Sequence, residues 1–502
     1  MGVGGQHDGQ SAGHSAVAVT AQPHVLVVPL PAQGHITSML KLAELLSLSG
    51  MRVTFLNTHY NHRLLLRFSA LRDRLARRPC LHLRSIPDGL PDDNPRTADR
   101  MGEFVLSLRA TWPSVLRELL LADPEGEPPV TCIVGDGFLD FAVDVAEELG
   151  IPIIAFRTSS ACSVWAYYCI PNLIATGRFP FQDGCDLDEL IACVPGMESF
   201  LRRRDMPSFC RVKDVADRAM QFVNGATQST TRFRGLILNT TEFAEASVLT
   251  HIRAHLPTTY PIGPVHALLK TVESSSAAEG GGAASSNSAS LWQEERTCMD
   301  WLDTRPPASV VYVSFGSVAL LKRDQLLEFW HGLVNCGYHF LWVARQGLVE
   351  DEDGSGVPEK LAEATRERGF LVGWAPQLEV LAHPAVGCFL THSGWNSTLE
   401  SMWAGVPMVC WPYFGDQQIN SRFVSEVWGI GLDMKDTCDR LFVEKAVREV
   451  MAGEGATRMR DAASEMAKMT RESAGEGGSS YVNLERLIRD IRSMSSKTLE
   501  KK

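Results

Sequence analysis

The chain has 502 residues, 45% of them apolar and 21% charged, and this length and balance predict two globular domains rather than one. Its formal net charge of −11 argues against a nucleic-acid-binding protein, because neutralising phosphates needs a concentrated basic surface. No run approaches the roughly 20 apolar residues that a membrane-spanning helix needs, so we expect no integral membrane association.

The cysteines and the first residues of the chain bear on where the protein resides. Twelve cysteines occur with no CxxC pair and no repeated spacing, which is typical of reduced thiols rather than of a disulfide or zinc framework. Residues 1–20 are rich in Gly, Ser, His and Ala and lack the charged-then-apolar order of a signal peptide. We therefore expect a cytoplasmic protein whose residues 1–20 form a disordered tail. We also expect it to be a monomer.

The first half of the chain alternates strand-like and helix-like segments. Residues 24–30, HVLVVPL, form a near-continuous apolar run, as a parallel strand buried on both faces requires. A helix is expected next at residues 36–49, and further strands are expected at residues 51–56, 131–134 and 151–156. This β-α-β order predicts a parallel α/β domain over residues 21–265.

A tract without apolar periodicity separates this half from a second one. Residues 271–290 read TVESSSAAEGGGAASSNSAS, and we interpret residues 266–295 as a linker that carries a flexible Gly/Ser-rich insertion. The alternation then resumes and predicts a second parallel α/β domain over residues 296–470. Its expected elements are strands at residues 309–315, 339–343, 370–374, 386–391 and 407–411, a helix at 322–336 and a helical stretch near Lys360.

One strand of the second domain ends in an unusual run of polar residues. The strand VGCFLT is followed by His392, and Ser393-Gly394-Trp395-Asn396-Ser397 then open a helix. Ligands bind at the carboxyl ends of strands in open parallel sheets, and a helix N-terminus favours anions. Residues 374–421 contain no Lys or Arg, so an anion here would rely on backbone N–H groups, His392 and small polar side chains. Alternatively, Ser397 and Glu400 form only a capping box that closes an ordinary helix.

Residues 374–417 favour the first interpretation. They read WAPQLEVLAHPAVGCFLTHSGWNSTLESMWAGVPMVCWPYFGDQ, which resembles the signature box of plant family-1 UDP-glycosyltransferases almost position for position. Ser393 stands where the family commonly has Cys, and Gly415 where it commonly has Ala. We expect neither departure to affect donor binding.

The resemblance implies a fold and a set of ligands. It implies the GT-B arrangement, an α/β fold of two facing Rossmann-like domains with parallel sheets and a cleft between them. The donor, a UDP-sugar, would bind residues 296–470, and a small hydrophobic acceptor would bind residues 21–265. Residues 471–502 would supply a helix that returns to the N-terminal domain and a basic tail, SSKTLEKK, which we expect to be disordered. Neither a cofactor nor a metal ion is expected.

The resemblance also implies a role for each donor-binding residue. Trp374 would stack on the uracil, because a flat base needs a flat apolar partner. The other expected contacts are the Ala375 backbone to the uracil edge, Gln377 and Glu400 to the ribose, His392, Asn396, Ser397 and Ser317 to the diphosphate, and Trp395, Asp416 and Gln417 to the sugar hydroxyls.

Two residues at the end of the box bear on the identity of the sugar. The Asp416 carboxylate would repel a glucuronate, and no cation lies near it in the sequence, so a neutral hexose is favoured. In the family, Gln at the position of Gln417 accompanies glucose, which we therefore expect as the transferred sugar.

Transfer to a hydroxyl needs a general base, and the N-terminal half offers His35. This residue follows the first strand, in PAQGH, where the dipole of the next helix favours a neutral ring. A histidine at such a turn is often structural, but Asp136, after another strand, could orient it. The resemblance assigns this pair to acceptor activation and places Thr158 near the sugar and leaving group. The mechanism would be a single displacement with inversion.

Four other signals are weaker. Asp186-Leu187-Asp188 and Asp351-Glu352-Asp353 resemble metal-binding motifs, but both lie in polar, loop-like stretches and are interpreted as solvated charge. Residues 202–204, all arginines, are interpreted in the same way. Trp165, Tyr167 and Tyr168 either wall an acceptor pocket or belong to a helix core.

Other functions of the same architecture remain open at this point. A UDP-sugar epimerase or hydrolase would turn over the donor without an acceptor, and an inactive nucleotide-sugar-binding protein would not turn it over. Intact His35, Asp136, Asp416 and Gln417 favour the transferase. The N-terminal region resembles the iridoid-type branch of the family, such as the 7-deoxyloganetic acid glucosyltransferases, and flavonoids or other phenols are alternative acceptors.

Overall fold

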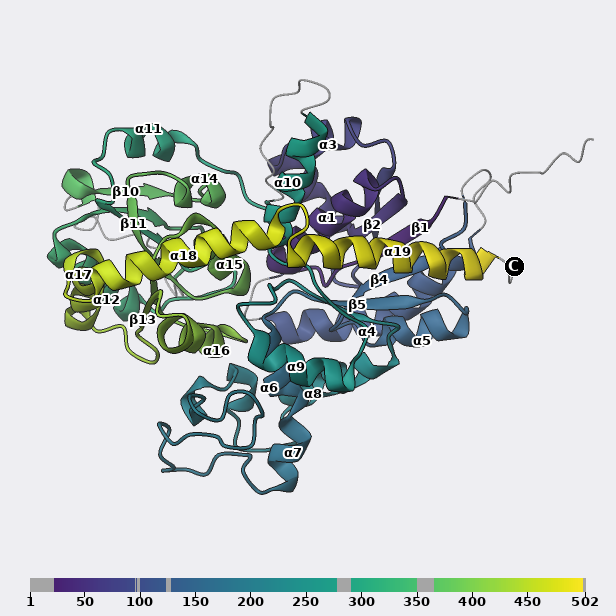
Figure 1. Cartoon of the computed structure of the whole chain (residues 1–502), viewed down its shortest axis with the longest axis horizontal. Helices are drawn as coiled ribbons and strands as arrows, with labels where there is room; N and C mark the ends of the chain where they lie inside the picture. The colour runs from purple at the N-terminus through teal and green to yellow at the C-terminus, as the bar shows by residue number, and fades with distance from the viewer. Residues whose placement is uncertain are drawn as a thin grey trace, which may run out of the picture.

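Two parallel β-sheets, each covered by helices, face one another in the computed structural model (Figure 1). The structure describes residues 22–94, 96, 100–122, 128–277, 290–349 and 365–499. Every named strand pair is parallel, which confirms the predicted class of two Rossmann-like α/β domains.

The N-terminal sheet has seven strands in the order β3-β2-β1-β4-β5-β6-β7. β1 is buried along its whole length, as its apolar sequence requires, and it pairs with β2 on one side and β4 on the other. The strands are β1 (His24–Val28), β2 (Arg52–Thr58), β3 (Leu81–Ile86), β4 (Cys132–Asp136), β5 (Ile153–Arg157), β6 (Leu236–Leu238) and β7 (Thr259–Pro261).

Helices cover both faces of this sheet. One face packs on α1 and α10, and the other on α4, α5, α6 and α8. The helices are α1 (Gln33–Leu48), α2 (His59–Phe68), α3 (Leu71–Ala76), α4 (Met101–Leu121), α5 (Phe141–Glu148), α6 (Ala161–Tyr168), α7 (Ile170–Ala175), α8 (Arg218–Gln228), α9 (Ala246–His255) and α10 (Val265–Ala277). α1 begins earlier than predicted, so His35 lies in its first turn.

The C-terminal sheet has six strands in the order β10-β9-β8-β11-β12-β13. α12 and α17 pack on one face, and α11, α14, α15 and α18 on the other. The strands are β8 (Val310–Ser314), β9 (His339–Val343), β10 (Gly369–Val372), β11 (Val386–Thr391), β12 (Met408–Cys410) and β13 (Gly431–Asp433). The helices are α11 (Thr297–Asp303), α12 (Arg323–Cys336), α14 (Gln377–Leu381), α15 (Trp395–Ala404), α16 (Gln417–Arg422), α17 (Arg440–Ala452), α18 (Ala456–Ala474) and α19 (Ser479–Leu499).

Two expectations about connecting segments were wrong. Residues 266–277 of the expected linker belong to helix α10, whose Leu268 and Leu269 are buried against the N-terminal domain. Residues 495–499 are not a disordered tail but the last turns of α19, because Ser495 is buried and its Oγ lies 2.9 Å from Thr131 Oγ1. Most of the Gly/Ser-rich insertion, and the helical stretch expected near Lys360, lie outside the described residues.

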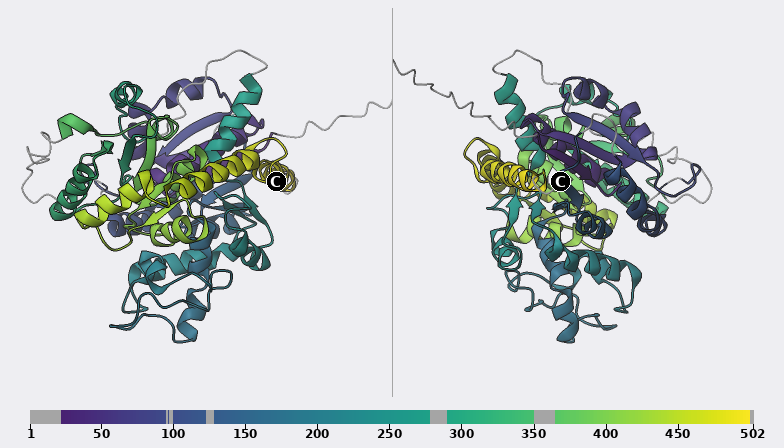
Figure 2. Two further views of the ribbon diagram at one scale, coloured as in Figure 1. Left: turned by 60° about the vertical axis from the view of Figure 1, so that its left-hand side comes forward. Right: turned by 90° about the vertical axis from the view of Figure 1, so that its right-hand side faces the viewer.

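The last two helices connect the domains. α18 packs against α15 of the C-terminal domain, and α19 then runs across to the N-terminal sheet, as Figures 1 and 2 show. Leu484, Leu487 and Ile491 of α19 are buried in the N-terminal core. α18 and α19 therefore connect the two domains on one side of the molecule.

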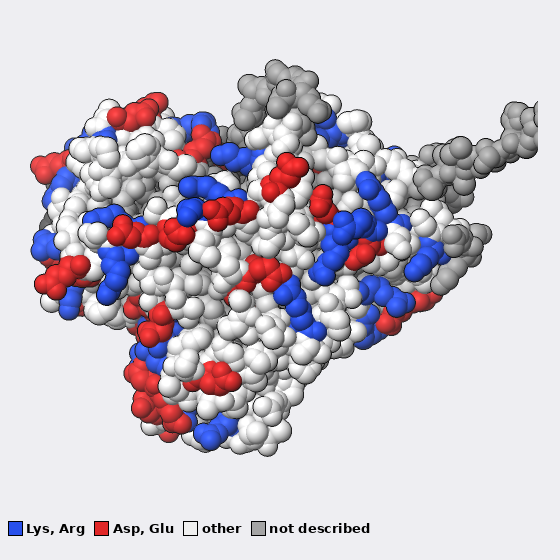
Figure 3. Space-filling model, viewed as in Figure 1, with Lys and Arg blue, Asp and Glu red and all other residues white. Residues whose placement is uncertain are grey.

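The described part of the chain carries mixed surface charge (Figure 3) and free cysteines. Figure 3 shows acidic and basic side chains interspersed over one face of the molecule, without a large field of basic charge. Among the helices in the described ranges, none is both long and apolar enough to cross a bilayer. All twelve cysteines are free thiols, as expected.

Candidate active site

A cavity of about 1450 Å³ lies between the two domains. All the predicted site residues line it except Asp136, which lies behind His35. Carboxyl ends of β1, β4 and β5 approach it from one domain, and those of β8, β10, β11 and β12 from the other. The structure thus brings these distant residues together around one cavity, while the role of each remains a prediction.

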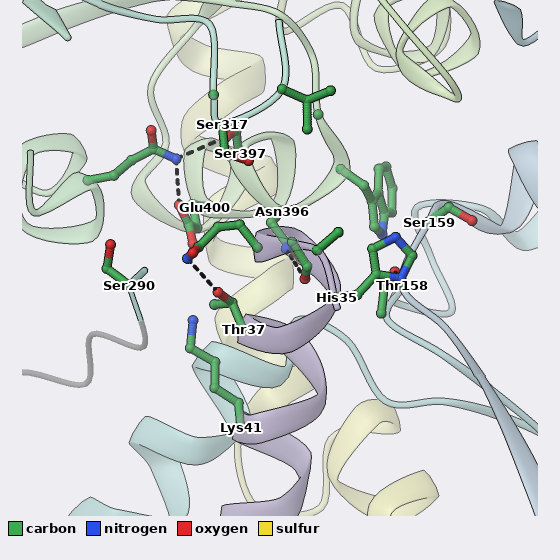
Figure 4. Close-up of a pocket in the computed structure, with 18 of the residues that line it drawn as sticks. His35, Thr37, Lys41, Thr158, Ser159, Ser290, Ser317, Asn396, Ser397 and Glu400 are labelled. Atoms are coloured by element: carbon green, nitrogen blue, oxygen red, sulfur yellow. Dashed lines mark hydrogen bonds between the residues drawn. The ribbon is translucent and has the colours of Figure 1, made fainter. Parts of the chain in front are cut away.

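His35 and Asp136 form a direct pair. Nδ1 of His35 lies 2.6 Å from Oδ2 of Asp136, and Thr158 Oγ1 lies 3.0 Å from the same nitrogen. Figure 4 shows Thr158 beside His35. With Nδ1–H donating to the carboxylate, Nε2 is left with its lone pair as a proton acceptor. The His35 side chain is 21% exposed and Asp136 is fully buried, so only the histidine reaches the cavity.

The surroundings of Asp136 keep it ionised. Burial on its own raises the pKa of this carboxyl, but the His35 charge and hydrogen bonds from His35, Phe138 N and Leu30 N outweigh it and lower the pKa. Arg157 is also fully buried, and its guanidinium lies over the Phe138 ring, 4.1 Å from the centroid. Burial lowers the pKa of Arg157 to about 10, and the Asp136 charge opposes that shift.

The donor half of the cavity centres on the turn between β11 and α15. His392 is packed so closely that a Cβ on Gly394 would lie 2.4 Å from its Nε2, and one on Gly316 would lie 2.5 Å away. Burial lowers the pKa of His392 to about 4, so the ring is neutral at physiological pH. A neutral imidazole can still donate one hydrogen bond to an anion.

The start of α15 is open toward ligand and is not closed by a capping box. Gly394 is the N-cap residue and provides no side-chain cap, while Ser397 lies inside the helix. The first intrahelical bond runs from Thr398 N to Gly394 O, so the preceding N–H groups have no partner in the helix. Gln377 Nε2 instead donates to Ser397 Oγ (2.9 Å) and to Glu400 Oε2 (2.7 Å). The capping-box alternative is therefore wrong.

Asn396 and Trp395 contact the other domain. Asn396 Nδ2 donates to Gly34 O (2.9 Å), and its Oδ1 accepts from Ser38 Oγ (2.8 Å). The Trp395 indole donates to Asn239 O (2.7 Å). Both side chains are thus engaged across the interface, and the contacts predicted for them with diphosphate and sugar remain predictions.

Asp416 and Gln417 form the end of the cavity next to His35. Burial raises the pKa of Asp416, opposed by a hydrogen bond from Asn420 Nδ2 (3.0 Å) and by the His35 charge. Gln417 Oε1 accepts from the backbone N–H groups of Tyr413 and Phe414, both at 2.8 Å. These bonds hold the loop before α16 in place and leave the Gln417 amide nitrogen as a donor.

The loop that bears Trp374 is supported by a residue that the sequence did not single out. Trp292 stacks on Trp374 with ring centroids 5.6 Å apart, and it does not line the cavity. Glu295 N donates to Trp374 O (2.8 Å), and Glu295 Oε1 accepts from Gly373 N (2.7 Å). Trp292 and Glu295, from the segment between the two domains, therefore support the Trp374 loop.

A second interdomain contact was also missed. Ser208 N donates to Gly415 O (2.9 Å), and Gly415 N donates to Ser208 Oγ (2.8 Å), which joins an N-terminal loop to the residue before Asp416. Nearby, fully buried Asp205 pairs with Lys435 (2.9 Å) and Arg202 (2.9 Å). Nothing in the local sequence signals the contacts of Ser208 with Gly415 and of Asp205 with Lys435, because these partners are separated by about two hundred residues.

Most of the weaker signals are not part of the site. Asp186 and Asp188 are in an exposed loop, where Asp188 pairs with Arg202 (2.9 Å) and Arg204 (2.8 Å), so residues 202–204 are an ion-paired segment rather than solvated charge. Residues 351–353 lie outside the described residues. Within the described ranges, no group of three or more His, Cys, Asp or Glu could hold a metal ion.

Of the three aromatic residues Trp165, Tyr167 and Tyr168, one lines the cavity and two pack against another helix. Tyr167 lines the cavity. Trp165 and Tyr168 instead stack together and against His251 and His255 of α9.

Comparisons with known proteins agree with this geometry. The family model described as "UDP-glucoronosyl and UDP-glucosyl transferase" matches residues 291–465. A 7-deoxyloganetic acid glucosyltransferase of Catharanthus roseus is 50% identical, over 94% of this chain and 98% of the relative. A myricetin 3-O-rhamnoside 1,2-glucosyltransferase of Crocosmia x crocosmiiflora is also 50% identical, over 95% of this chain and 97% of its own.

A solved structure extends the similarity to the fold. Os79 from O. sativa in complex with UDP superposes with a TM-score of 0.77 at 28% identity, covering 93% of this chain and 100% of that one. The fold has two facing parallel-sheet domains, and the predicted residues line the cavity between them. The relatives named above, which match over nearly their full length, are glucosyltransferases. The chain belongs to the family of UDP-glucosyl transferases, as a plant family-1 UDP-glycosyltransferase with the GT-B fold.

Proposed function

We propose that the protein transfers glucose from UDP-glucose to a hydroxyl group of a small specialised metabolite, with inversion at the anomeric carbon. The observation that carries the proposal is the 2.6 Å contact between His35 and Asp136, in which His35 lines the same cavity as Trp374, Glu400 and Gln417. His35 Nε2 takes the proton of the acceptor hydroxyl, and Asp136 orients the ring and stabilises its charged form. The hydroxyl attacks from the face opposite UDP, so an α-linked donor gives a β-linked product.

The donor half of the cavity would hold UDP through the contacts expected from the sequence. Trp374 stacks on uracil, Gln377 and Glu400 bind the ribose, and the turn from His392 to Ser397, with Ser317, binds the diphosphate. Asp416 and Gln417, beside His35, bind the sugar. Glucose as the sugar is supported by the names of both relatives above.

The acceptor would bind the N-terminal half of the cavity. Met101, Val105, Phe138, Phe209 and Phe222 line this part, which supports a small hydrophobic acceptor. An iridoid or other terpenoid, or a flavonoid or other phenol, is the class that the relatives support. We further propose a cytoplasmic monomer that needs no metal ion.

The test is incubation of the protein with UDP-glucose and a panel of iridoids, flavonoids and simple phenols, with UDP release and product mass as readouts. We expect UDP release only when an acceptor is present, together with formation of a β-glucoside that NMR identifies. The activity should persist in EDTA and be abolished in His35→Ala. Acceptor-independent turnover would indicate a hydrolase or epimerase, and binding of UDP-glucose without turnover would indicate a binding protein. Either outcome contradicts the proposal.

A further inference from the structure

A lysine from the N-terminal domain reaches the donor half of the cavity. Lys41 lies on α1, the helix whose first turn holds His35, and it lines the same cavity as Glu400 and Gln377. In Figure 4 it lies on the Glu400 and Ser290 side of the pocket, away from His35 and Thr158. The absence of Lys and Arg from residues 374–421 thus did not exclude a cation from the donor site, because this one comes from the other domain.

Lys41 is buried without a direct partner. Only 4% of its surface is exposed, and among the described residues it has neither a hydrogen bond nor an ion pair from its ammonium group. A buried ammonium without a partner is costly, and burial lowers its pKa accordingly. The Glu400 charge is the largest effect opposing that shift, so Glu400 is the acidic group that Lys41 faces most strongly.

Two further acids, Glu44 and the cavity-lining Glu294, also act on Lys41 by their charge, more weakly than Glu400. Glu44, on the same helix, is fully buried and pairs with both Arg74 and Arg78 (3.1 Å to the latter). Glu400 accepts from Gln377 through Oε2, and it does not form a direct ion pair with Lys41. Across the cavity, an ammonium on one domain therefore faces a carboxylate on the other, without direct contact between them.

This arrangement suits a hydroxyl-bearing ligand. A hydroxyl donates one hydrogen bond and accepts others, so it can donate to a carboxylate while it accepts from an ammonium. Hydrogen bonds to charged groups are also stronger than neutral ones. In a UDP-sugar, a diol of this kind is found on the ribose, the part for which Glu400 is expected to provide the carboxylate.

We propose that Lys41 binds the ribose of the UDP-sugar opposite Glu400, so that the nucleotide is held between the two domains. The inference rests on the proposed function, since it takes Glu400 as the ribose-binding carboxylate. It makes a residue of the acceptor-binding domain a determinant of nucleotide affinity and of selectivity for ribose over deoxyribose. Because Lys41 and His35 share α1, the same contact ties the bound nucleotide to the helix that carries the base.

Lys41→Met tests the proposal, since Met is of similar length and leaves no buried charge. Lys270→Met is the matched control, because Lys270 lines the same cavity but is exposed. We expect the KM for UDP-glucose and the inhibition constant of UDP to rise about tenfold or more in Lys41→Met, with kcat within about twofold. Lys270→Met should leave all three constants within about twofold.

Selectivity between nucleotides is the readout that a merely structural lysine would not change. Wild-type protein should prefer UDP-glucose over its 2′-deoxy or 3′-deoxy analogue, and Lys41→Met should lose most of that preference for at least one of them. The ratio of kcat/KM values within one variant does not depend on the fraction of folded protein. Unchanged ratios for both analogues would overturn the proposal, even if UDP bound more weakly.

The two proposals fail separately. If wild-type protein transfers no glucose, the proposed function fails, and calorimetric binding of UDP, 2′-deoxy-UDP and 3′-deoxy-UDP to wild-type and Lys41→Met protein still tests Lys41. If wild-type protein transfers glucose and the variant binds all three nucleotides with wild-type affinities, only the role of Lys41 fails.

Discussion

Asn396 of the donor domain donates a hydrogen bond to the carbonyl oxygen of Gly34, the residue before His35, at 2.9 Å. Ser38 Oγ, one turn further along α1, donates back to Asn396 Oδ1 at 2.8 Å. The helix that is expected to bind diphosphate is thereby joined directly to the helix that carries the base. The Asn396 side chain thus fixes the position of the donor-site helix relative to the helix that carries His35.

Asn396→Ala should therefore lower kcat, because it removes the contacts with Gly34 and Ser38 that position the helix carrying His35. Loss of hydrogen bonds worth about 1 kcal/mol each predicts a decrease of about tenfold, measured under saturating donor and acceptor. Asn335→Ala, an exposed position on α12, is the control and should leave kcat unchanged. A kcat equal to wild type in Asn396→Ala would show that the contact does not position His35.

Asp136→Asn should impair catalysis more than binding. An amide cannot stabilise the charged imidazole that forms when His35 takes a proton, so kcat should fall by about 100-fold or more, within the range of general-base effects. The KM for UDP-glucose should change little, because Asp136 does not line the cavity. Asp186→Asn, in an exposed loop, is the matched control; equal activities of the two variants would refute the dyad.

Gly394→Ala should weaken UDP binding. The added Cβ would lie 2.4 Å from His392 Nε2, so the ring or the start of α15 must move, and we expect a loss of affinity of about tenfold or more by calorimetry. Gly225→Ala on α8, where a Cβ meets nothing within 4 Å, is the control and should bind UDP normally. Unchanged affinity in Gly394→Ala would mean that the position of His392 is unimportant for UDP.

The pKa of His392 predicts a dependence of stability on pH. Because burial lowers the folded-state pKa to about 4 from an ordinary value of 6.5, the unfolded chain binds a proton between these values that the folded protein excludes. The contribution of His392 is therefore fully present above pH 6.5 and is lost as the pH falls toward 4, by at most about 1.4 kcal/mol per pH unit. Urea unfolding of wild-type and His392→Asn protein over this range should give free-energy curves that converge as the pH falls; parallel curves would contradict the shift.

Asp205→Ala should destabilise the protein as a whole. Asp205 is fully buried and pairs with Lys435 and Arg202. Because Lys435 keeps Asp433 (2.8 Å) and Arg202 keeps Asp188 as partners, the loss of Asp205 should lower the free energy of unfolding by about 1–3 kcal/mol. Asp183→Ala removes an ion pair with Lys213 in which both side chains are exposed. It should cause no measurable change in the free energy of unfolding by urea denaturation. Equal stabilities of the two variants would show that the Asp205 cluster does not hold the interface.

The sequence predicted best where local patterns are strong. Residues 339–343 and 386–391 were predicted as strands with the bounds that the structure shows, because each is a continuous apolar run. The three-residue strands β6, β7 and β13 were not predicted. The equally short β12 was predicted, because it lies in the apolar run PMVCW at residues 407–411. The last turns of α19 were missed because their burial depends on Thr131, far away in the sequence.

The amino-acid sequence by itself determined the class of the fold, the family and the identity of most site residues, because apolar runs, helical periodicity and the box at residues 374–417 are local in the chain. Tertiary structure alone decided how these residues are used. It directed Asn396 and Trp395 to the other domain, placed Trp292 behind Trp374, and brought Lys41 to face Glu400. Contacts between residues hundreds of positions apart depend on how two domains pack, and no local pattern encodes that geometry.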